Sequence, residues 1–325
     1  MDRAIDPQLT ARFRADLVEL WPEESGELRS LGVAVSGGPD SVALLLLAHA
    51  ARPEILEAAT VDHGLRPESA AEAQWVAQLC RTLDVPHRTV RVDVEAGNLQ
   101  SRAREARYQA LDRWTDERRL SAVATAHHAD DQAETLLMRL NRGSGLPGLA
   151  GVRSSAIVPG GKGRLLRPLL GWRKAELEAL VRGAGLEPVA DPSNRDTRFD
   201  RVRVREALAA ADWIDPLALA RSAALLGEAE ATLEELVAES YSRQVTRENG
   251  CFHFTVSRTD YIRVEVVGRI FAEMGFAPPR SEIARLVARL GSGANASLAG
   301  VLGVPSNENG IACWTFRPEP PRRQD

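Results

Sequence analysis

The chain has 325 residues, a length that favours two domains because one compact core rarely grows beyond about 250–300 residues. Hydrophobic residues make up 44% and charged residues 26%, so the composition excludes a fibrous or wholly disordered protein. The formal net charge is -4, so there is no overall basic field, and contact with nucleic acid would need a local basic patch.

Hydrophobic periodicity predicts alternating helices and strands in the first half of the chain. Strand-like runs cover 31–35, 55–61, 87–94 and 121–126. Helical spacing covers 9–20, 40–51, 68–83, 99–119 and 130–141. This alternation is typical of parallel strands joined by helical crossovers. We therefore expect an α/β, Rossmann-like fold with helices on both faces of a parallel sheet and ligands at the carboxyl ends of its strands.

The second half of the chain shows a change of pattern. A Gly, Pro and Ser-rich loop is expected at 143–163, followed by a short strand at 164–170, a helix at 172–184, polar turns at 191–200 and an Arg-rich helix to residue 211. From residue 216 the pattern predicts a long helix to 245, a strand at 251–256 and a hairpin at 296–304 and 311–316. We place one domain at 1–215 and a smaller, mostly helical domain at 216–325.

The cysteines and the N-terminus indicate the compartment. Cys80, Cys251 and Cys313 lie far apart with no CxxC pair, and their odd number excludes a complete disulfide framework. The first ten residues lack the apolar run of a secretory signal. The most apolar stretch, 42–51, is about half of the roughly 20 residues that a membrane span needs. We expect a cytoplasmic protein with no membrane anchor, and no obligate protein partner is evident.

The strongest local motif is the sequence VAVSGGPDSVALLLLA, in which an expected strand leads through a glycine turn into an expected helix. Glycines let the backbone approach a phosphate, and the N–H groups of the helix N-terminus then face the anion. Asp40 is unusual in such a turn unless a cation binds there, and Mg²⁺ bridging phosphates would explain it. No GK[ST] follows, which excludes a Walker A loop. The pattern SGGxDS resembles the PP-loop of ATP-using adenylating enzymes, which implies ATP-binding residues Ser36, Gly37, Gly38, Pro39, Asp40 and Ser41.

A second motif, the segment HHADDQAET at 127–135, follows the expected strand at 121–126. Asp130 and Glu134 are one helical turn apart and share a face, and Asp131 stands at the helix start. These carboxylates would suit an ammonium group or Mg²⁺. Two alternatives are stabilisation of the helix dipole by acids in its first turn and a transition-metal site supplied by His-His-x-x-Asp.

Basic residues gather on both sides of the loop region. Eight of them, and no Asp or Glu, fall between residues 135 and 175, and five arginines fall between 195 and 205. This local footprint would bind RNA, with an affinity that weakens as salt rises. The candidate RNA contacts are Arg139, Arg142, Arg167, Arg201 and Arg205.

Together these segments resemble the tRNA(Ile)-lysidine synthetases. The resemblance covers about residues 30–210 and is carried by SGGPDS at 36–41, VDHGLRPES at 61–69, the AR..RY pattern at 103–108, HHADDQAETLLMRLNRGSGLPGL at 127–149, RPLL at 167–170 and DPSNRDTRFDRVRVR at 191–205. The family usually has Arg-Asn within FxRNxxR, whereas Val202 follows Arg201 here, so a role for that asparagine does not carry over. The chain resembles the short form that lacks the last C-terminal domain.

The resemblance implies a reaction. ATP would adenylate the ring carbonyl oxygen of the wobble cytidine in the CAU anticodon of tRNA(Ile), and the side-chain amine of L-lysine would then displace AMP to give lysidine. The specificity of the tRNA would change from methionine to isoleucine. The wobble base would be splayed into the site, as single-stranded loop bases commonly are. The domain at 216–325 would contact the tRNA.

The resemblance also implies site residues. The catalytic candidates are Asp40, which would hold Mg²⁺, and Asp131 and Glu134, which would steer the lysine ammonium group, with one of the two accepting its proton. Arg104 and Arg107 would neutralise a phosphate or the lysine carboxylate. His63, after an expected strand, would lie near the nucleotide.

Two other functions remain as hypotheses. The chain could be another PP-loop adenylating enzyme, either a tRNA thiolase, although its cysteines lack the spacing of a cluster site, or an NAD synthetase-like enzyme, although the HHADDQAET segment argues against this. It could also be a non-catalytic tRNA-binding protein with a relic nucleotide site, which the intact Asp40, Asp131 and Glu134 argue against.

Overall fold

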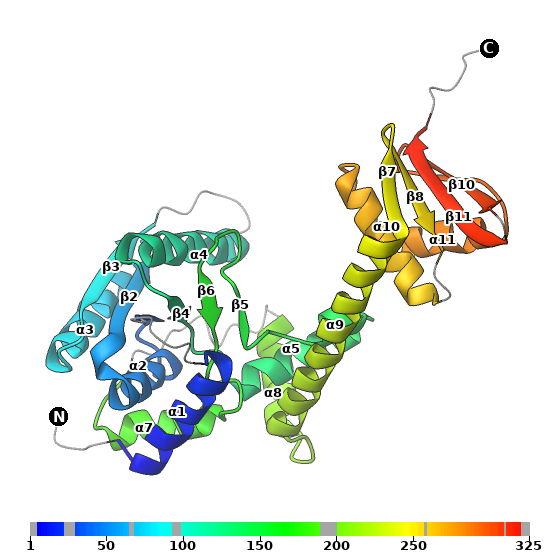
Figure 1. The fold of residues 1–325 in the computed structure, drawn as a ribbon. Coiled ribbons are helices and arrows are strands. Elements are labelled where there is room, and N and C mark those ends of the chain that lie inside the picture. Colours follow the sequence, from blue (N-terminus) through cyan, green and yellow to red (C-terminus); the bar gives the residue numbers. More distant parts are fainter. Residues whose placement is uncertain are drawn as a thin grey trace. The chain divides into compact units, whose positions relative to one another are not determined.

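A computed structural model describes residues 5–22, 30–64, 68–92, 99–188, 200–256, 259–308 and 310–319 (Figure 1). The chain divides into two compact units, 1–227 and 228–325. The polar segment expected to form turns at 191–200 lies outside the described residues except for Asp200, which begins a helix.

The first unit is built on a six-stranded sheet in the order β3-β2-β1-β4-β6-β5. Five strands are parallel, and β5 pairs antiparallel with β6 at one edge. The strands are β1 (Leu31–Ala34), β2 (Leu56–Asp62), β3 (His87–Arg91), β4 (Ala122–Ala124), β5 (Ser155–Ile157) and β6 (Arg164–Leu166). The chain runs outward from β1 through β2 to β3 and then returns to β4 on the other side of β1. Parallel sheets commonly bind ligands at such a change of direction, which here lies at the carboxyl ends of β1 and β4.

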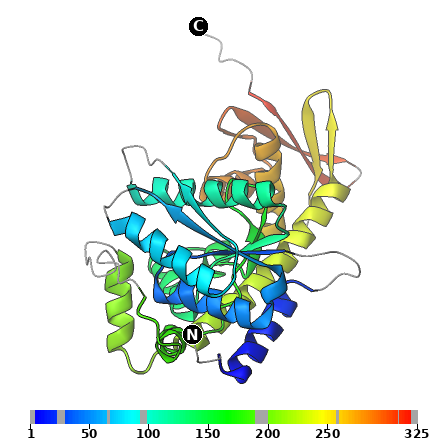
Figure 2. The same ribbon diagram turned by 90° about the vertical axis from the view of Figure 1, so that its left-hand side faces the viewer.

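Helices cover both faces of this sheet, as the sequence predicts (Figures 1 and 2). One face packs on α1 (Pro7–Leu20), α2 (Pro39–Ala51), α3 (Glu68–Thr82) and α7 (Lys174–Gly183), and the other packs on α4 (Leu99–Arg118). Successive side chains of a strand point to opposite faces of the sheet, so each strand can contribute to the packing on both faces. In β1, Leu31 and Val33 pack in the hydrophobic core on the side of α1, α2, α3 and α7. Gly32, between them, lies against Trp114 of α4 on the other face. The predicted α/β class is therefore confirmed.

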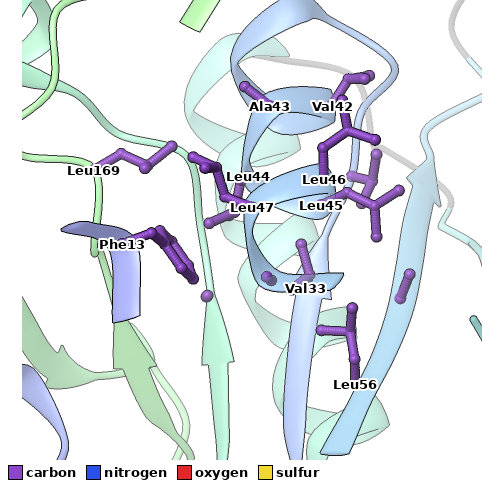
Figure 3. Close-up of a cluster of buried hydrophobic side chains, with 14 of the residues drawn as sticks. Phe13, Val33, Val42, Ala43, Leu44, Leu45, Leu46, Leu47, Leu56 and Leu169 are labelled. Atoms are coloured by element: carbon purple, nitrogen blue, oxygen red, sulfur yellow. The ribbon is translucent and has the colours of Figure 1, made fainter. Parts of the chain in front are cut away.

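Helix α2 is apolar all round because it is enclosed by the sheet and by two other helices. Figure 3 shows Leu44 and Leu47 pointing toward Phe13 of α1 and Leu169, and Val33 of β1 also belongs to this cluster. The apolar run at 42–51 is thus a buried helix. In the part of the chain that the structure describes, no helix has both the length and the apolar character that crossing a membrane requires.

The segment 143–163, expected to be a loop, also contains the short helix α6 (Leu146–Leu149) and the edge strand β5. Neither element was predicted, because the segment has too few apolar residues to show a hydrophobic periodicity. The first unit continues through α5 (Ala129–Asn141) and α8 (Asp200–Ala210) into α9 (Pro216–Gln244). The division between the units falls within α9 because Ala223 is buried and Gly227 lies beside Arg153 and Ala150, so the first turns of α9 pack with the first unit.

The second unit combines helices with a five-stranded antiparallel sheet in the order β7-β8-β11-β10-β9. Its elements after α9 are β7 (Val245–Glu248), β8 (Cys251–Thr255), α10 (Asp260–Glu273), α11 (Arg280–Gly291), β9 (Ala296–Leu298), β10 (Val301–Glu308) and β11 (Ile311–Pro318). The hairpin is β10–β11, and β8 and β9 pair with it on either side. The expected strand 296–304 is divided, because a turn at 299–300 with positive φ values reverses the chain between β9 and β10. Two edge-to-face aromatic pairs, Phe254 with Trp314 and Phe271 with Phe316, join strands and a helix in its core.

Candidate active site

Four polar segments meet at the carboxyl edge of the parallel sheet. The turn 36–41 follows β1, His63 follows β2, His127 and His128 follow β4, and Arg167 follows β6. Because β1, β2, β4 and β6 are parallel, their ends share one edge. The fold therefore brings together the phosphate-loop motif and the HHADDQAET motif.

The turn after β1 is shaped for an anion. Gly37 has a φ of 90°, a conformation that favours glycine. Ser41 closes the turn, because its hydroxyl donates to the carbonyl of Gly38 at 2.9 Å and accepts from the backbone N–H of Ser36 at 3.1 Å. Gly38 caps α2 and has no side chain to bond the first-turn amides, and a Cβ at this position would meet only Ser36 Oγ, at 3.8 Å. The amides at the start of α2 thus face open space that a phosphate could fill.

Asp40 stands in the first turn of α2, beside this space. Its Oδ2 lies 3.5 Å from Nε2 of His128, whereas its buried Oδ1 has no hydrogen-bond partner among the described residues. An unpaired buried carboxylate oxygen is costly unless a cation or a donor satisfies it. The side chain therefore fits the role of a Mg²⁺ ligand, since Mg²⁺ often takes only one or two carboxylates together with substrate phosphates.

Glu134 on α5 is 2% exposed and is neutralised by two arginines of α8. Arg205 Nε donates to Oε1 at 2.7 Å, and Arg201 Nε donates to Oε2 at 2.7 Å. The hydrogen bond with Glu134 raises the pKa of Arg205 despite partial burial. Glu134 thus joins α8 to α5 from inside the site.

Asp131 and Asp130 start the same helix but have different partners. Asp131 accepts a hydrogen bond from Arg201 Nη2 at 3.1 Å, and its side chain remains 18% exposed. Asp130 accepts from the backbone N–H of Lys174 at 2.8 Å and faces Arg173, so it holds the start of α7. Although Asp130 and Glu134 share a face of α5, their bonds lead to two different helices, α7 and α8.

A basic cluster lies near the carboxyl ends of β4 and β6. It consists of Arg104, Arg107 and Tyr108 of α4 together with His127 and Arg167. Both α4 guanidinium groups lie near the Tyr108 ring, at 5.0 and 5.2 Å from its centroid. Two buried atoms, Nε of Arg107 and Nδ1 of the nearby His63, lack hydrogen-bond partners among the residues that the structure describes. Unmet polar groups gathered around several positive charges would suit an anion.

The pKa shifts in and near the basic cluster have a common origin. Burial, followed by the charges of Arg167 and Arg107, holds the pKa of His127 well below its usual value of 6.5. Burial and then the charge of Arg107 lower the pKa of His63. Burial would raise the pKa of Tyr108, but the nearby arginines outweigh it and lower that pKa. Both histidines are therefore held neutral, as expected where positive charge is already concentrated.

His128 lies at the junction with the acidic side of the site. Burial alone would lower its pKa, but the contact with Asp40 and the charges of Asp131 and Asp130 outweigh burial and raise it. No three His, Cys, Asp or Glu side chains within the described ranges are arranged to hold a metal ion. The alternative of a transition-metal site at His-His-x-x-Asp therefore gains no support from the geometry.

The five arginines expected to contact tRNA have varied surroundings. Arg142 is exposed and pairs with Asp200, and Arg201 and Arg205 are partly exposed beside Glu134. Arg139 donates to the carbonyls of Gly148 and Gly151, and Arg167, only 5% exposed, donates to the carbonyl of Arg153. Val202, at the position where the resembling family usually has Asn, is buried.

Three contributors to the site were not predicted from the sequence. Tyr108 and His127 belong to two separate motifs, and their spacing did not show that both would lie beside Arg167. Gln132 is 3% exposed and forms two hydrogen bonds with the backbone of Val152, at 2.9 and 2.7 Å. A polar residue on the buried face of an amphipathic helix was the available signal for Gln132.

Comparisons with known proteins agree with this geometry. Residues 9–211 match the model of the PP-loop domain. The chain is 47% identical over 319 residues to the tRNA(Ile)-lysidine synthase of Novosphingobium aromaticivorans, covering 97% of this chain and 95% of that protein. It is 38% identical over 304 residues to the tRNA(Ile)-lysidine synthase of Zymomonas mobilis, covering 90% of each.

A solved structure supports the fold. The U34-tRNA thiolase NcsA from Methanococcus maripaludis superposes with a TM-score of 0.56 at 17% identity, covering 67% of this chain and 79% of that chain. Identity this low extends the likeness to the architecture alone. With a PP-loop domain spanning most of the first unit and near full-length similarity to proteins of one name, the chain belongs to the tRNA(Ile)-lysidine synthase family within the PP-loop superfamily.

Proposed function

We propose that this protein uses ATP to attach L-lysine to the wobble cytidine of the CAU anticodon of tRNA(Ile), forming lysidine and changing the specificity of the tRNA from methionine to isoleucine. The observation that carries the proposal is that one edge of the sheet gathers the phosphate loop, three carboxylates and a cluster of arginines. The carboxylates are those of Asp40, Asp131 and Glu134, and the arginines are Arg104, Arg107 and Arg167. The reaction brings together a triphosphate, an ammonium group and a carboxylate, and each would find its complement there.

The phosphate loop would hold the leaving pyrophosphate. The amides at the start of α2, the hydroxyl of Ser36 and the backbone of Gly37 and Gly38 would bind its oxygens, and Asp40 Oδ1 would bind Mg²⁺. Mg²⁺ supplies charge neutralisation on the phosphates when it is bound. Pro39 and Ser41 fix the shape of the turn, and His63 would lie at the nucleotide from the end of β2.

Asp131 is the better of the two α5 carboxylates for contact with lysine. Glu134 is 2% exposed and both its oxygens are bonded to arginines at 2.7 Å, so it has little capacity to bind a further cation. Asp131 is 18% exposed, and its carboxylate accepts longer hydrogen bonds than that of Glu134, at 3.1 Å from Arg201 Nη2 and 3.2 Å from the backbone N–H of His128. It would orient the ε-ammonium group and accept its proton as the neutral amine attacks the adenylated ring and AMP departs. Arg104 and Arg107 would bind the lysine carboxylate or a phosphate.

The RNA would approach over the partly exposed arginines. Arg142 directly follows α5, and Arg201 and Arg205 lie on α8. The second unit would add contacts to the body of the tRNA. Arg139 and Arg167 would act indirectly, since both hold backbone carbonyls of the 148–153 segment. A tRNA substrate is consistent with action in the cytoplasm, and the proposal requires neither a membrane nor a protein partner.

The decisive experiment supplies the protein with ATP, radiolabelled lysine and a tRNA(Ile) transcript that bears CAU. Label should enter the RNA only when ATP is present, and a transcript with another wobble base should stay unlabelled. If a reference lysidine synthase labels the same transcript and this protein does not, the proposal is wrong.

The roles within the site can be separated by variants. Asp40→Asn should abolish pyrophosphate release, whereas Asp131→Asn should raise the KM for lysine more than the KM for ATP. Asp84→Asn is a matched control, because Asp84 precedes β3 at the opposite edge of the sheet and Asn also tolerates its φ of 57°. Equal effects of Asp131→Asn and Asp84→Asn would remove Asp131 from the lysine site.

A further inference from the structure

The side chain of His128 lies between carboxylates from two separate helices. The residue is 3% exposed and caps α5. Its Nε2 lies 3.5 Å from Oδ2 of Asp40 on α2 and 3.5 Å from Oδ2 of Asp131 on α5. Its Nδ1 lies 3.8 Å from Oδ2 of Asp130. Neither motif, taken alone, indicated that the second histidine of HHADDQAET would reach the phosphate loop.

The hydrogen bonds around His128 identify which ring nitrogen carries the proton in the neutral ring. The backbone N–H of Asp131 donates to Nδ1 at 3.3 Å, and the carboxylate of Asp131 accepts from the backbone N–H of His128 at 3.2 Å. A nitrogen that accepts a hydrogen bond has no hydrogen of its own, so the ring proton is on Nε2. The Nε2–H group therefore faces the two carboxylate oxygens at 3.5 Å.

This arrangement counters a repulsion. Asp40 and Asp131, both only partly exposed, present like charges to the same ring nitrogen of His128, and like charges repel each other. At 3.5 Å the contacts are longer than strong hydrogen bonds, so one N–H attracts both carboxylates without binding either tightly. Asp40 Oδ2 is thereby held toward α5, while Oδ1 stays without a partner among the described groups.

We propose that His128 is a positioning residue for Asp40: its Nε2–H holds one oxygen of the Asp40 carboxylate and so orients the other to receive the Mg²⁺ of a bound nucleotide. The proposal rests only on the nucleotide-binding part of the proposed function and is independent of the lysine and tRNA steps. His128 itself would touch neither the metal nor the nucleotide.

Two substitutions separate this role from the capping of α5. Asn is among the best N-cap residues, so His128→Asn should keep the bond to the Asp131 amide, but its short side chain does not extend to Asp40. Gln is longer and places an amide N–H near the position of Nε2. His49→Asn is the matched control, because it makes the same chemical change in the last turn of α2, away from the site.

The measurement is equilibrium dialysis with radiolabelled AMPPNP, carried out with Mg²⁺ and again with EDTA. With Mg²⁺, His128→Asn should bind about tenfold more weakly than the wild type, as expected for loss of one contact between an N–H donor and a charged acceptor. His128→Gln should recover most of that loss. With EDTA all these proteins should bind alike, and His49→Asn should match the wild type throughout.

Three results would overturn the proposal: unchanged Mg²⁺-dependent binding in His128→Asn, an equal loss with Mg²⁺ and with EDTA, or no recovery in His128→Gln. Thermal unfolding checks that His128→Asn is folded. Should it not fold, His128→Gln is compared with His128→Ala, and tighter Mg²⁺-dependent binding by the Gln variant supports the proposal whereas equal affinities refute it. A failure of lysine transfer to tRNA would leave all these binding results intact, so the two proposals fail separately.

Discussion

Arg205 donates a hydrogen bond from Nε to Oε1 of Glu134 at 2.7 Å, linking α8 to a carboxylate that is almost fully buried on α5. Arg201, one turn earlier on α8, donates from its Nε to the other carboxylate oxygen of Glu134. A buried carboxylate is tolerated only when its charge is compensated, so this contact stabilises the fold as well as shaping the site.

Replacing Arg205 by Ala should therefore destabilise the protein. We expect the free energy of unfolding to fall by about 1–2 kcal/mol, less than for a fully buried pair, because Arg205 is about one-third exposed and Arg201 remains. Urea unfolding would measure this. Arg203→Ala is the control, since Arg203 pairs with the exposed Asp200. Equal stability of the Arg205→Ala and Arg203→Ala variants would show that Glu134 does not depend on Arg205.

Gly32 in β1 is required by the close approach of α4. A Cβ at this position would lie 2.7 Å from the ring of Trp114 and 2.8 Å from Leu120 Cδ1, and both side chains are buried. Gly32→Ala should lower the free energy of unfolding by about 1–3 kcal/mol through overpacking. Gly183→Ala, at the end of α7 with open space around it, should be neutral or slightly stabilising. An unaltered unfolding curve for Gly32→Ala would mean that α4 moves without cost.

The partly buried His127 should make stability depend on pH. Burial and the charges of Arg167 and Arg107 hold its pKa well below 6.5, so the folded state binds fewer protons than the unfolded state. The contribution of His127 to the free energy of unfolding is complete above about pH 6.5, the usual pKa of histidine in an unfolded chain. As the pH falls below that pKa, this contribution decreases by up to about 1.4 kcal/mol per pH unit.

His127→Asn removes this titration, while its amide can still bond Thr125, which now contacts Nδ1 at 3.1 Å. Urea unfolding from about pH 7.5 to about pH 5.5 should give a flatter stability profile for this variant than for the wild type. Parallel profiles would refute the assignment of a neutral His127.

Cys80 should be unreactive in the folded protein. It is fully buried in the core on α3, and burial raises the pKa of its thiol to about 12. Because the thiolate is the nucleophile, iodoacetamide near about pH 8 should modify the partly exposed Cys251 and leave Cys80 unmodified until the protein is denatured. Mass spectrometry of digested protein would show this. Rapid modification of Cys80 without denaturant would indicate that the core around α3 opens readily.

Much of the first unit could be predicted because its signals are local. The glycine turn after an apolar run, the helical spacing of 99–119 and the acids at the start of α5 depend on neighbours within a few residues, and each gave an element close to its observed position. The family assignment is confirmed for the same reason, since short motifs carry it. Helix α6, strand β5 and the five-stranded pairing in the second unit were not predictable, because their stability comes from contacts between distant segments.

The roles within HHADDQAET show the same limit. The sequence by itself determined that several carboxylates follow a strand near a phosphate loop, since strand order along the chain and helical periodicity are properties of the chain. Only the tertiary structure decided that Asp130 holds α7, that Glu134 binds Arg201 and Arg205, and that His128 faces Asp40. These partners lie between 40 and 90 residues away in the sequence or on another helix, and the electrostatic energy of a charge depends on distance and burial, which spacing along the chain does not contain.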